Sequence, residues 1–223
     1  PTEQPAAPTA PTTEITEPDA SEPATSEPEH AQADMDHTLV KLSHGPVIVN
    51  TGAYDGAYME DGTDETVSGV LMIVVKNTGS DPIQYADITL PTDAGQAKFT
   101  LSTLPSGASC ILLEQTRMAY TGSERVSEAE SQNVAFFTGP LTLHEDRLQL
   151  QLLDDAINVI NISGEDISGD VVIYYKNAAS DLYYGGITYR VRLEGGLAAD
   201  EVRQIMPTHF TKSGSEIMFI TTE

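Results

Sequence analysis

Short runs of apolar residues, separated by turn residues, follow one another from Leu39 to the end of the chain. In residues 187–194 apolar and polar side chains alternate without a break, which is typical of a half-buried antiparallel strand. Residues 71–77 are apolar at nearly every position, which favours a strand covered on both faces. The same reasoning predicts strands at residues 47–50, 98–104, 110–113, 133–137, 148–153, 201–206 and 217–220. We therefore predict an all-β fold, with an acidic loop at residues 54–65.

One of these runs occurs twice. Residues 67–81 read VSGVLMIVVKNTGSD and residues 167–181 read ISGDVVIYYKNAASD, with seven identical residues and no gap. The similarity continues at residues 106–113 and 213–220, so we interpret the chain as two copies of one small β domain. The predicted organisation is a tether at residues 1–38, copy one at 39–138 and copy two at 139–223. The two copies are expected to share one strand order, with Ile73 and Ile173 both buried.

The repeated strand also predicts which of its faces is buried. Asp170 and Lys176 occupy even positions, so the even face, which includes Tyr174, is expected to face solvent. The odd face is expected to form the core, with Leu71, Ile73 and Val75 in copy one and Val171, Ile173 and Tyr175 in copy two.

Composition narrows the classes of partner. The net charge of −23 arises from 34 acidic and 11 basic residues. Such a chain repels phosphate backbones and anionic lipids, so we expect neither nucleic acid nor a membrane surface as a partner. No run of eighteen apolar residues occurs, so no transmembrane segment is expected. The single cysteine, Cys110, excludes an internal disulfide framework.

Residues 1–38 differ from the rest of the chain. They hold seven of the thirteen prolines and nine acidic residues, but neither Lys nor Arg. A segment so polar and so highly charged cannot bury enough apolar surface to offset the entropy of ordering, so we predict a disordered, extended tether.

Deleting residues 1–36 is accordingly expected to leave the melting temperature nearly unchanged, because a tether contributes nothing to a core. Calorimetry on the full and shortened chains measures this directly. A drop of several degrees would show that the segment is docked on the folded part.

Two motifs give the chain a family resemblance. Residues 74–79 read VVKNTG and residues 104–107 read LPSG. An apolar strand that runs into Asn-Thr-Gly and a later Pro-Gly turn resemble the bacterial immunoglobulin-like modules of the FxLYD and CARDB type. The resemblance covers about residues 45–115 and 147–220, and copy two departs from it at Ala179 and at residues 212–214, KSG. It implies two tandem immunoglobulin-like β-sandwiches, surface-attached and non-catalytic.

The tether resembles the segment that follows the lipid-modified cysteine in Gram-positive lipoproteins. This second resemblance implies an exported bacterial surface protein, held at the membrane by a lipid anchor upstream of Pro1.

Few residues suggest chemistry. Cys110 lies in an apolar strand without a nearby basic residue, so we expect a small buried hydrophobe rather than a nucleophile. The histidines lack the spacing of a zinc site. Asp61, Asp64 and Glu65 are weak calcium candidates, because their spacing does not match an EF-hand loop. We expect no metal and no other cofactor.

The strongest candidate contact face lies in copy two. Tyr174, Tyr183 and Tyr184 occur in one predicted hairpin, and Arg190 and Arg192 lie on the polar face of its second strand. Tyr and Arg are enriched at protein interfaces, so these five residues are the predicted binding residues. The alternative is that they only pair across the strands.

The sequence therefore predicts a non-catalytic exported surface module with a structural spacer or adhesion role. The alternative is a carbohydrate- or peptide-binding module that uses the tyrosine-rich hairpin. An enzyme is less expected, because no catalytic spacing occurs.

Overall fold

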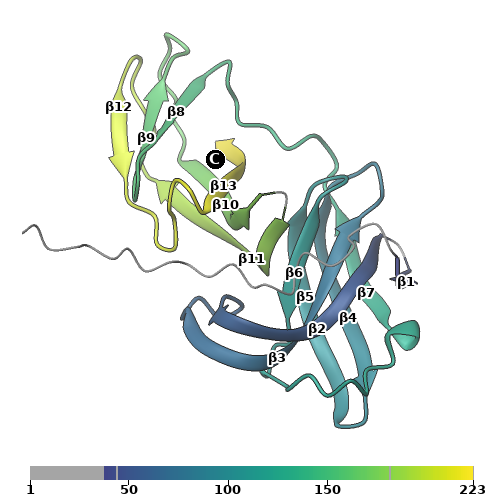
Figure 1. Ribbon diagram of the computed structural model, residues 1–223. Helices are drawn as coiled ribbons and strands as arrows, with labels where there is room; N and C mark the ends of the chain where they lie inside the picture. Colours follow the sequence, from purple (N-terminus) through teal and green to yellow (C-terminus); the bar gives the residue numbers. More distant parts are fainter. Residues whose placement is uncertain (1–37, 44, 181, 223) are drawn as a thin grey trace, which may run out of the picture.

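The computed structural model describes residues 38–43, 45–180 and 182–222. The predicted tether therefore lies outside the described residues, except for Thr38. Within the described residues, thirteen strands and one short 3-10 turn form three sheets (Figure 1). The strands are β1 (Val40–Lys41), β2 (Pro46–Tyr58), β3 (Glu65–Asn77), β4 (Ile83–Thr92), β5 (Gly95–Leu104), β6 (Ser109–Leu113), β7 (Glu130–Phe136), β8 (Leu148–Leu152), β9 (Ile157–Asn161), β10 (Val171–Ala179), β11 (Leu182–Leu193), β12 (Val202–Ile205) and β13 (Ser215–Thr222), and the turn is η1 (Val126–Glu128).

These elements confirm the predicted all-β fold with immunoglobulin-like sandwich packing. In the first half, β1, β2, β3 and β6 face the sheet β5-β4-β7. In the second half, β11, β10 and β13 face the sheet β12-β9-β8. None of the helical structure in the described residues is long and apolar enough to cross a membrane.

The predicted core positions are confirmed. Ile73 and Ile173 are both fully buried, as are the odd-numbered side chains around them. Each buried aliphatic side chain of this size contributes about 1.5–3 kcal/mol relative to an exposed one. The odd face of β3 packs against β4 and β5, and that of β10 packs against β8 and β9.

The prediction that the even face is exposed is wrong for most of its residues. Val70, Met72 and Val74 of β3 are buried in a second cluster, with residues of β2, β6 and the start of β11. In the second half Lys176 is fully buried, although Tyr174 is half-exposed. In the first half the β2–β3 hairpin curves around the sheet and covers this face (Figure 1). Lys176 is instead enclosed by β5 and β11, whose carbonyls accept its hydrogen bonds.

The loop predicted at residues 54–65 is also largely wrong. β2 continues past Gly52 to Tyr58, and the loop is confined to the residues between Tyr58 and Glu65. The pairing of β2 with β3 shifts register twice, near Asn50 and near Gly56. Such bulges bend a strand, and here they give the hairpin the curvature that brings its tip beneath the second half.

The structure confirms the repeat for the pairing of β3 with β6 and of β10 with β13, but not for the strands that follow β3 and β10 in the chain. β3 and β6 pair antiparallel with Val75 opposite Cys110, and β10 and β13 pair antiparallel with Tyr175 opposite Ile217, which are equivalent positions. The following strands differ: β4 lies in the opposite sheet, whereas β11 pairs with β10 itself. The expectation of one shared strand order is therefore wrong.

The two connections explain this difference. In the first half, the Asn77 side chain donates to the carbonyls of Asp81 and Leu104, and the chain leaves through Pro82 toward the other sheet. In the second half, Ala179 is already paired with Leu182, so a tight hairpin keeps β11 beside β10. The boundary predicted at residues 138 and 139 stays a prediction, because β6 and β11 join the halves in one sheet.

Candidate functional site

The two halves are joined at β11. Its first residues, Leu182 to Tyr184, pair in parallel with β6 of the first half. Pairing of β11 with β10 is interrupted between Tyr184 and Tyr189, opposite Lys176. The residues of this bulge, 185–188, leave the ladder and lie against β5, so their backbone polar groups need other partners.

Lys176 donates hydrogen bonds to the backbone carbonyls of this bulge. Its ammonium donates to the carbonyls of Gly185 (3.0 Å) and Ile187 (2.8 Å) in the bulge, and to that of Ser102 in β5 (3.0 Å). These three bonds use all three N–H donors of a lysine. Burial lowers the pKa of Lys176, and the nearby Cys110 and Glu60 oppose that shift. The side chain thus links both halves through backbone atoms.

Glu60 accepts the hydrogen bond of a backbone N–H in the bulge, that of Gly186. It lies at the tip of the β2–β3 hairpin and accepts hydrogen bonds from the N–H of Leu113 (2.9 Å) and of Gly186 (3.0 and 2.9 Å). Burial raises the pKa of Glu60, while these two bonds and Lys176 oppose the rise. Lys176 and Glu60 each oppose the pKa shift that burial causes in the other. The region where these two side chains bind the β11 bulge, β5 and β6 is called the joint below.

The bulge also touches β5 at close range. The hydroxyl of Ser102 donates to the carbonyl of Gly186 at 2.8 Å. The same Ser102 hydroxyl lies 2.9 Å from the hydroxyl of Thr188. At Gly186 an added Cβ would lie only 1.7 Å from the carbonyl oxygen of Thr100. Glycine is therefore required here, because the two backbones approach too closely for a side chain.

Cys110 lies in the same joint and is fully buried, which confirms the expectation of a small buried residue. Its thiol donates to the carbonyl of Gly185, with a sulfur–oxygen distance of 3.2 Å. Burial raises the pKa of the thiol to about 12. The thiolate, which is the reactive form, is therefore scarce at neutral pH.

Cys110 is expected to resist thiol reagents in the folded protein. At pH 8 we expect negligible reaction with Ellman's reagent in buffer and one thiol per chain after unfolding in guanidinium, where its pKa returns toward 9.0. Rapid stoichiometric labelling of the native chain would contradict the closed joint.

A second contact between the halves lies nearer the surface. The imidazole Nδ1 of His209, in the loop between β12 and β13, lies 2.7 Å from the carboxylate of Asp64 in the hairpin tip. The His209 ring stacks on Tyr189 at 4.9 Å between centroids, and Tyr189 stacks on Tyr175 at 5.5 Å. Asp64 and His209 both have positive φ.

The weak calcium candidates face cations of the chain itself. Asp61 and Glu65 both bind the guanidinium of Arg117, at 2.9 and 2.6 Å, and Asp64 contacts His209. Arg117 also lies over the ring of Tyr58, 4.5 Å from its centroid. Among the residues that the structure describes, no group of three acidic, His or Cys side chains is arranged to hold a metal.

The five predicted binding residues do not form one exposed face. Tyr174 lies opposite Arg190 across the strands, and its ring stacks on Phe219 at 4.2 Å. Arg192 is exposed but forms an ion pair of 3.0 Å with Asp170, within the same half.

The two remaining tyrosines lie elsewhere. Tyr183 is only 7% exposed and packs in the core of the first half, where its hydroxyl is hydrogen-bonded to Glu216. Tyr184 packs on the second cluster, over the even face of β3. A contact face at Tyr174 and Arg190 stays a prediction, and Tyr183 does not belong to it.

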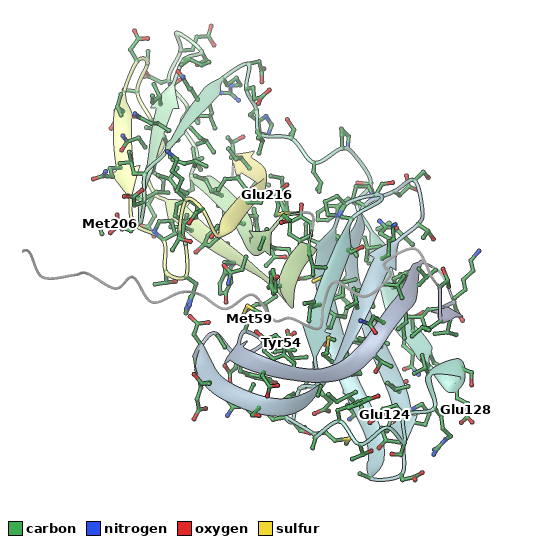
Figure 2. All side chains as sticks on the ribbon, in the orientation of Figure 1. Tyr54, Met59, Glu124, Glu128, Met206 and Glu216 are labelled. Carbon is green, nitrogen blue, oxygen red and sulfur yellow. The ribbon has the colours of Figure 1, made fainter. Side chains whose placement is uncertain are left out.

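An open groove of about 650 Å³ lies beside the linker between the halves. Its lining combines proline and other apolar side chains with hydroxyls and two carboxylates. The lining residues are Ser80, Asp81, Pro82, Pro105, Ser106, Phe137, Thr138, Gly139, Pro140, Leu141, Glu216 and Met218. Figure 2 shows Glu216 at this junction of the two halves.

The joint was missed by reasoning from the sequence. The alternation of β10 placed Lys176 on a solvent face, whereas the structure encloses it. One signal did point to it: Gly185 and Gly186 interrupt an otherwise regular strand pattern, and glycines at such a position indicate a bulge or a close backbone approach.

No protein-family model, curated protein or solved structure matches the chain. The similarity to immunoglobulin-like modules of the FxLYD and CARDB type therefore stays a prediction.

Proposed function

We propose that the chain is a non-catalytic structural module of a bacterial surface, in which two β-sandwich halves are locked together as one rigid spacer. The observation that carries the proposal is the buried joint. Lys176 and Glu60 bind backbone groups of both halves, and the Lys176 ammonium uses all three of its donors on carbonyls of the chain itself. Groups used in this way position the chain rather than a substrate.

Rigidity follows from the same contacts. A flexible pair of domains meets through a polar, hydrated surface, so relative motion is the usual expectation. Here opening the joint would break the parallel pairing of β6 with β11 and expose a buried lysine and a partly buried glutamate. Each such exposure leaves backbone partners unpaired, so the closed arrangement is favoured.

The exported location is part of the proposal. It is supported by the single buried cysteine, the net charge of −23 and the Pro/Thr/Glu-rich segment at residues 1–38. Labelling of intact host cells with an antibody to residues 39–223 tests it, and signal only after cell lysis would contradict it.

Calorimetry tests the rigid module. If the halves form one unit, the full chain unfolds in a single transition whose calorimetric and van't Hoff enthalpies agree. Two separate transitions, or a van't Hoff enthalpy near half the calorimetric value, would show two independent halves and would remove the basis for a rigid spacer.

A further inference from the structure

β12 is a free edge, and exposed apolar side chains lie on it at Val202 and directly after it at Met206. Within the described part of the chain it pairs with β9 alone, and Figure 1 shows it as the outermost strand of its sheet. Val202 and Met206 are 57% and 69% exposed, the highest values among the large hydrophobic residues described (Met206 is labelled in Figure 2). An exposed apolar edge strand is a template for pairing with another chain.

The outward face of this sheet carries no charge at its paired positions. Two rows of neighbours cross the three strands: Gln149, Ile160 and Val202 in one, and Gln151, Asn158 and Gln204 in the other. The second row consists of amides, and the amide of Asn158 donates to Gln151 at 3.0 Å. On a chain with a net charge of −23, a face free of charge resembles the core of a protein interface.

We propose that β12 pairs antiparallel with β12 of a second copy, across a two-fold axis at Gln204. In such a pair, residues directly opposite each other point to the same face. Val202 and Met206 each lie two positions from Gln204, so Val202 of one copy lies opposite Met206 of the other. The two most exposed apolar side chains then cover one another. Gln204 lies opposite its own equivalent and continues the amide row across the axis.

The spacing is what selects a second copy as the occupant. A two-fold contact requires a surface that is complementary to itself. Two apolar residues placed symmetrically about an amide meet this requirement, since an amide both donates and accepts. Pro207, which lacks an N–H, ends the pairing after Met206. Arg203 is already paired with Glu201 of its own copy at 2.7 Å, so it adds no unpaired charge.

Sedimentation equilibrium of the full chain tests the proposal. We expect a weak, reversible dimer, because the contact is small, and we expect it to strengthen between 0.05 and 0.5 M NaCl, as salt screens the repulsion between two acidic copies. Val202→Lys and Met206→Lys are each expected to raise the dissociation constant about tenfold or more.

Ile162→Lys is the matched control. Ile162 is 46% exposed and shares the outward parity of Ile160, but it is not on the β12 edge. It is expected to leave dimerisation unchanged. A chain that stays monomeric at all concentrations and both salt levels overturns the proposal. So does equal weakening by Ile162→Lys, which would indicate stacking of the faces instead of pairing of the edges.

A crosslink tests the axis itself. Opposed residues in an antiparallel pair have Cβ atoms about 5 Å apart, so Gln204→Cys is expected to form a disulfide-linked dimer under mild oxidation. Gln149→Cys, on the far edge strand β8, is expected to stay monomeric, and the buried Cys110 contributes no background. Absence of the Gln204→Cys dimer, or equal crosslinking of the control, refutes the two-fold at Gln204.

Discussion

Replacing Gly186 by alanine is expected to disrupt the joint between the two halves. The added Cβ would lie 1.7 Å from the carbonyl oxygen of Thr100 and 3.1 Å from a carboxylate oxygen of Glu60. The first overlap is with backbone, so no change of rotamer relieves it. Either β5 or the β11 bulge must move, and each movement breaks bonds to Lys176 or Glu60.

The expected loss in the free energy of unfolding is at least about 3 kcal/mol, the upper range for overpacking in a well-packed interior. Urea denaturation measures the loss, and calorimetry shows whether the single transition splits into two. Gly139→Ala is the control, because an added Cβ there meets nothing within 4 Å. Wild-type stability in the Gly186→Ala variant would mean that the close approach of β11 to β5 is absent in solution.

Replacing Lys176 by methionine is expected to cost about 3–5 kcal/mol of stability. Methionine has nearly the same length and fills the same space, so the variant removes the charge and its donors without leaving a large cavity. It removes the lysine donor from three carbonyls, of which those of Gly185 and Ser102 keep a bond from the Cys110 thiol and the Thr188 hydroxyl, and it leaves the Glu60 carboxylate without the opposing charge of Lys176. Hydrogen bonds from a charged donor contribute about 1.5–3 kcal/mol each, so the loss of the three Lys176 bonds accounts for a cost of this size.

Chemical denaturation of the variant measures this loss. Lys212→Met removes the same charge from an exposed position, and it is expected to change stability by no more than about 0.5 kcal/mol. If Lys176→Met were as stable as the wild type, the proposed locking of the halves by this side chain would be wrong. The joint would then depend on apolar packing and sheet pairing alone.

The Lys176 result would also separate two parts of the proposal. A variant that is less stable but still unfolds in one step would show that the shared sheet, through β6 and β11, keeps the halves coupled. A variant that unfolds in two steps would show that the buried lysine is itself the coupling element. In both cases the polar joint is structural, as proposed.

The local alternation of apolar and polar residues was sufficient to predict strands with one solvent-exposed face and to predict which of their positions are buried. Of the predicted strand 187–194, residues 187–193 lie within β11, and Ile73 and Ile173 are buried as their parity predicted. The repeat correctly matched the pairing of β3 with β6 to that of β10 with β13. Both successes rest on alternation, because an antiparallel pair with the same alternation buries the same positions.

Local pattern failed wherever a distant segment covered a face. Lys176 appeared to belong to solvent, because its own strand carries no sign of the β11 bulge whose carbonyls receive it. Residues 54–58 resembled an acidic, Gly-rich loop, but pairing with β3 makes them a strand. The connection after Asn77 sends β4 to the opposite sheet, and no alternation within β4 or β11 could distinguish that outcome from a hairpin.

The sequence by itself determined the all-β class, the repeated strand and its core positions, because alternation and turn residues act over a few neighbours. The tertiary structure decided which strands share a sheet, what encloses Lys176 and Glu60, and which edge carries Val202 and Met206 into solvent. Those outcomes depend on contacts between residues far apart in the chain, such as Ser102 with Lys176 or Glu60 with Gly186. Burial of a polar group is favourable only when such partners meet it, and the partners exist only once the chain has folded.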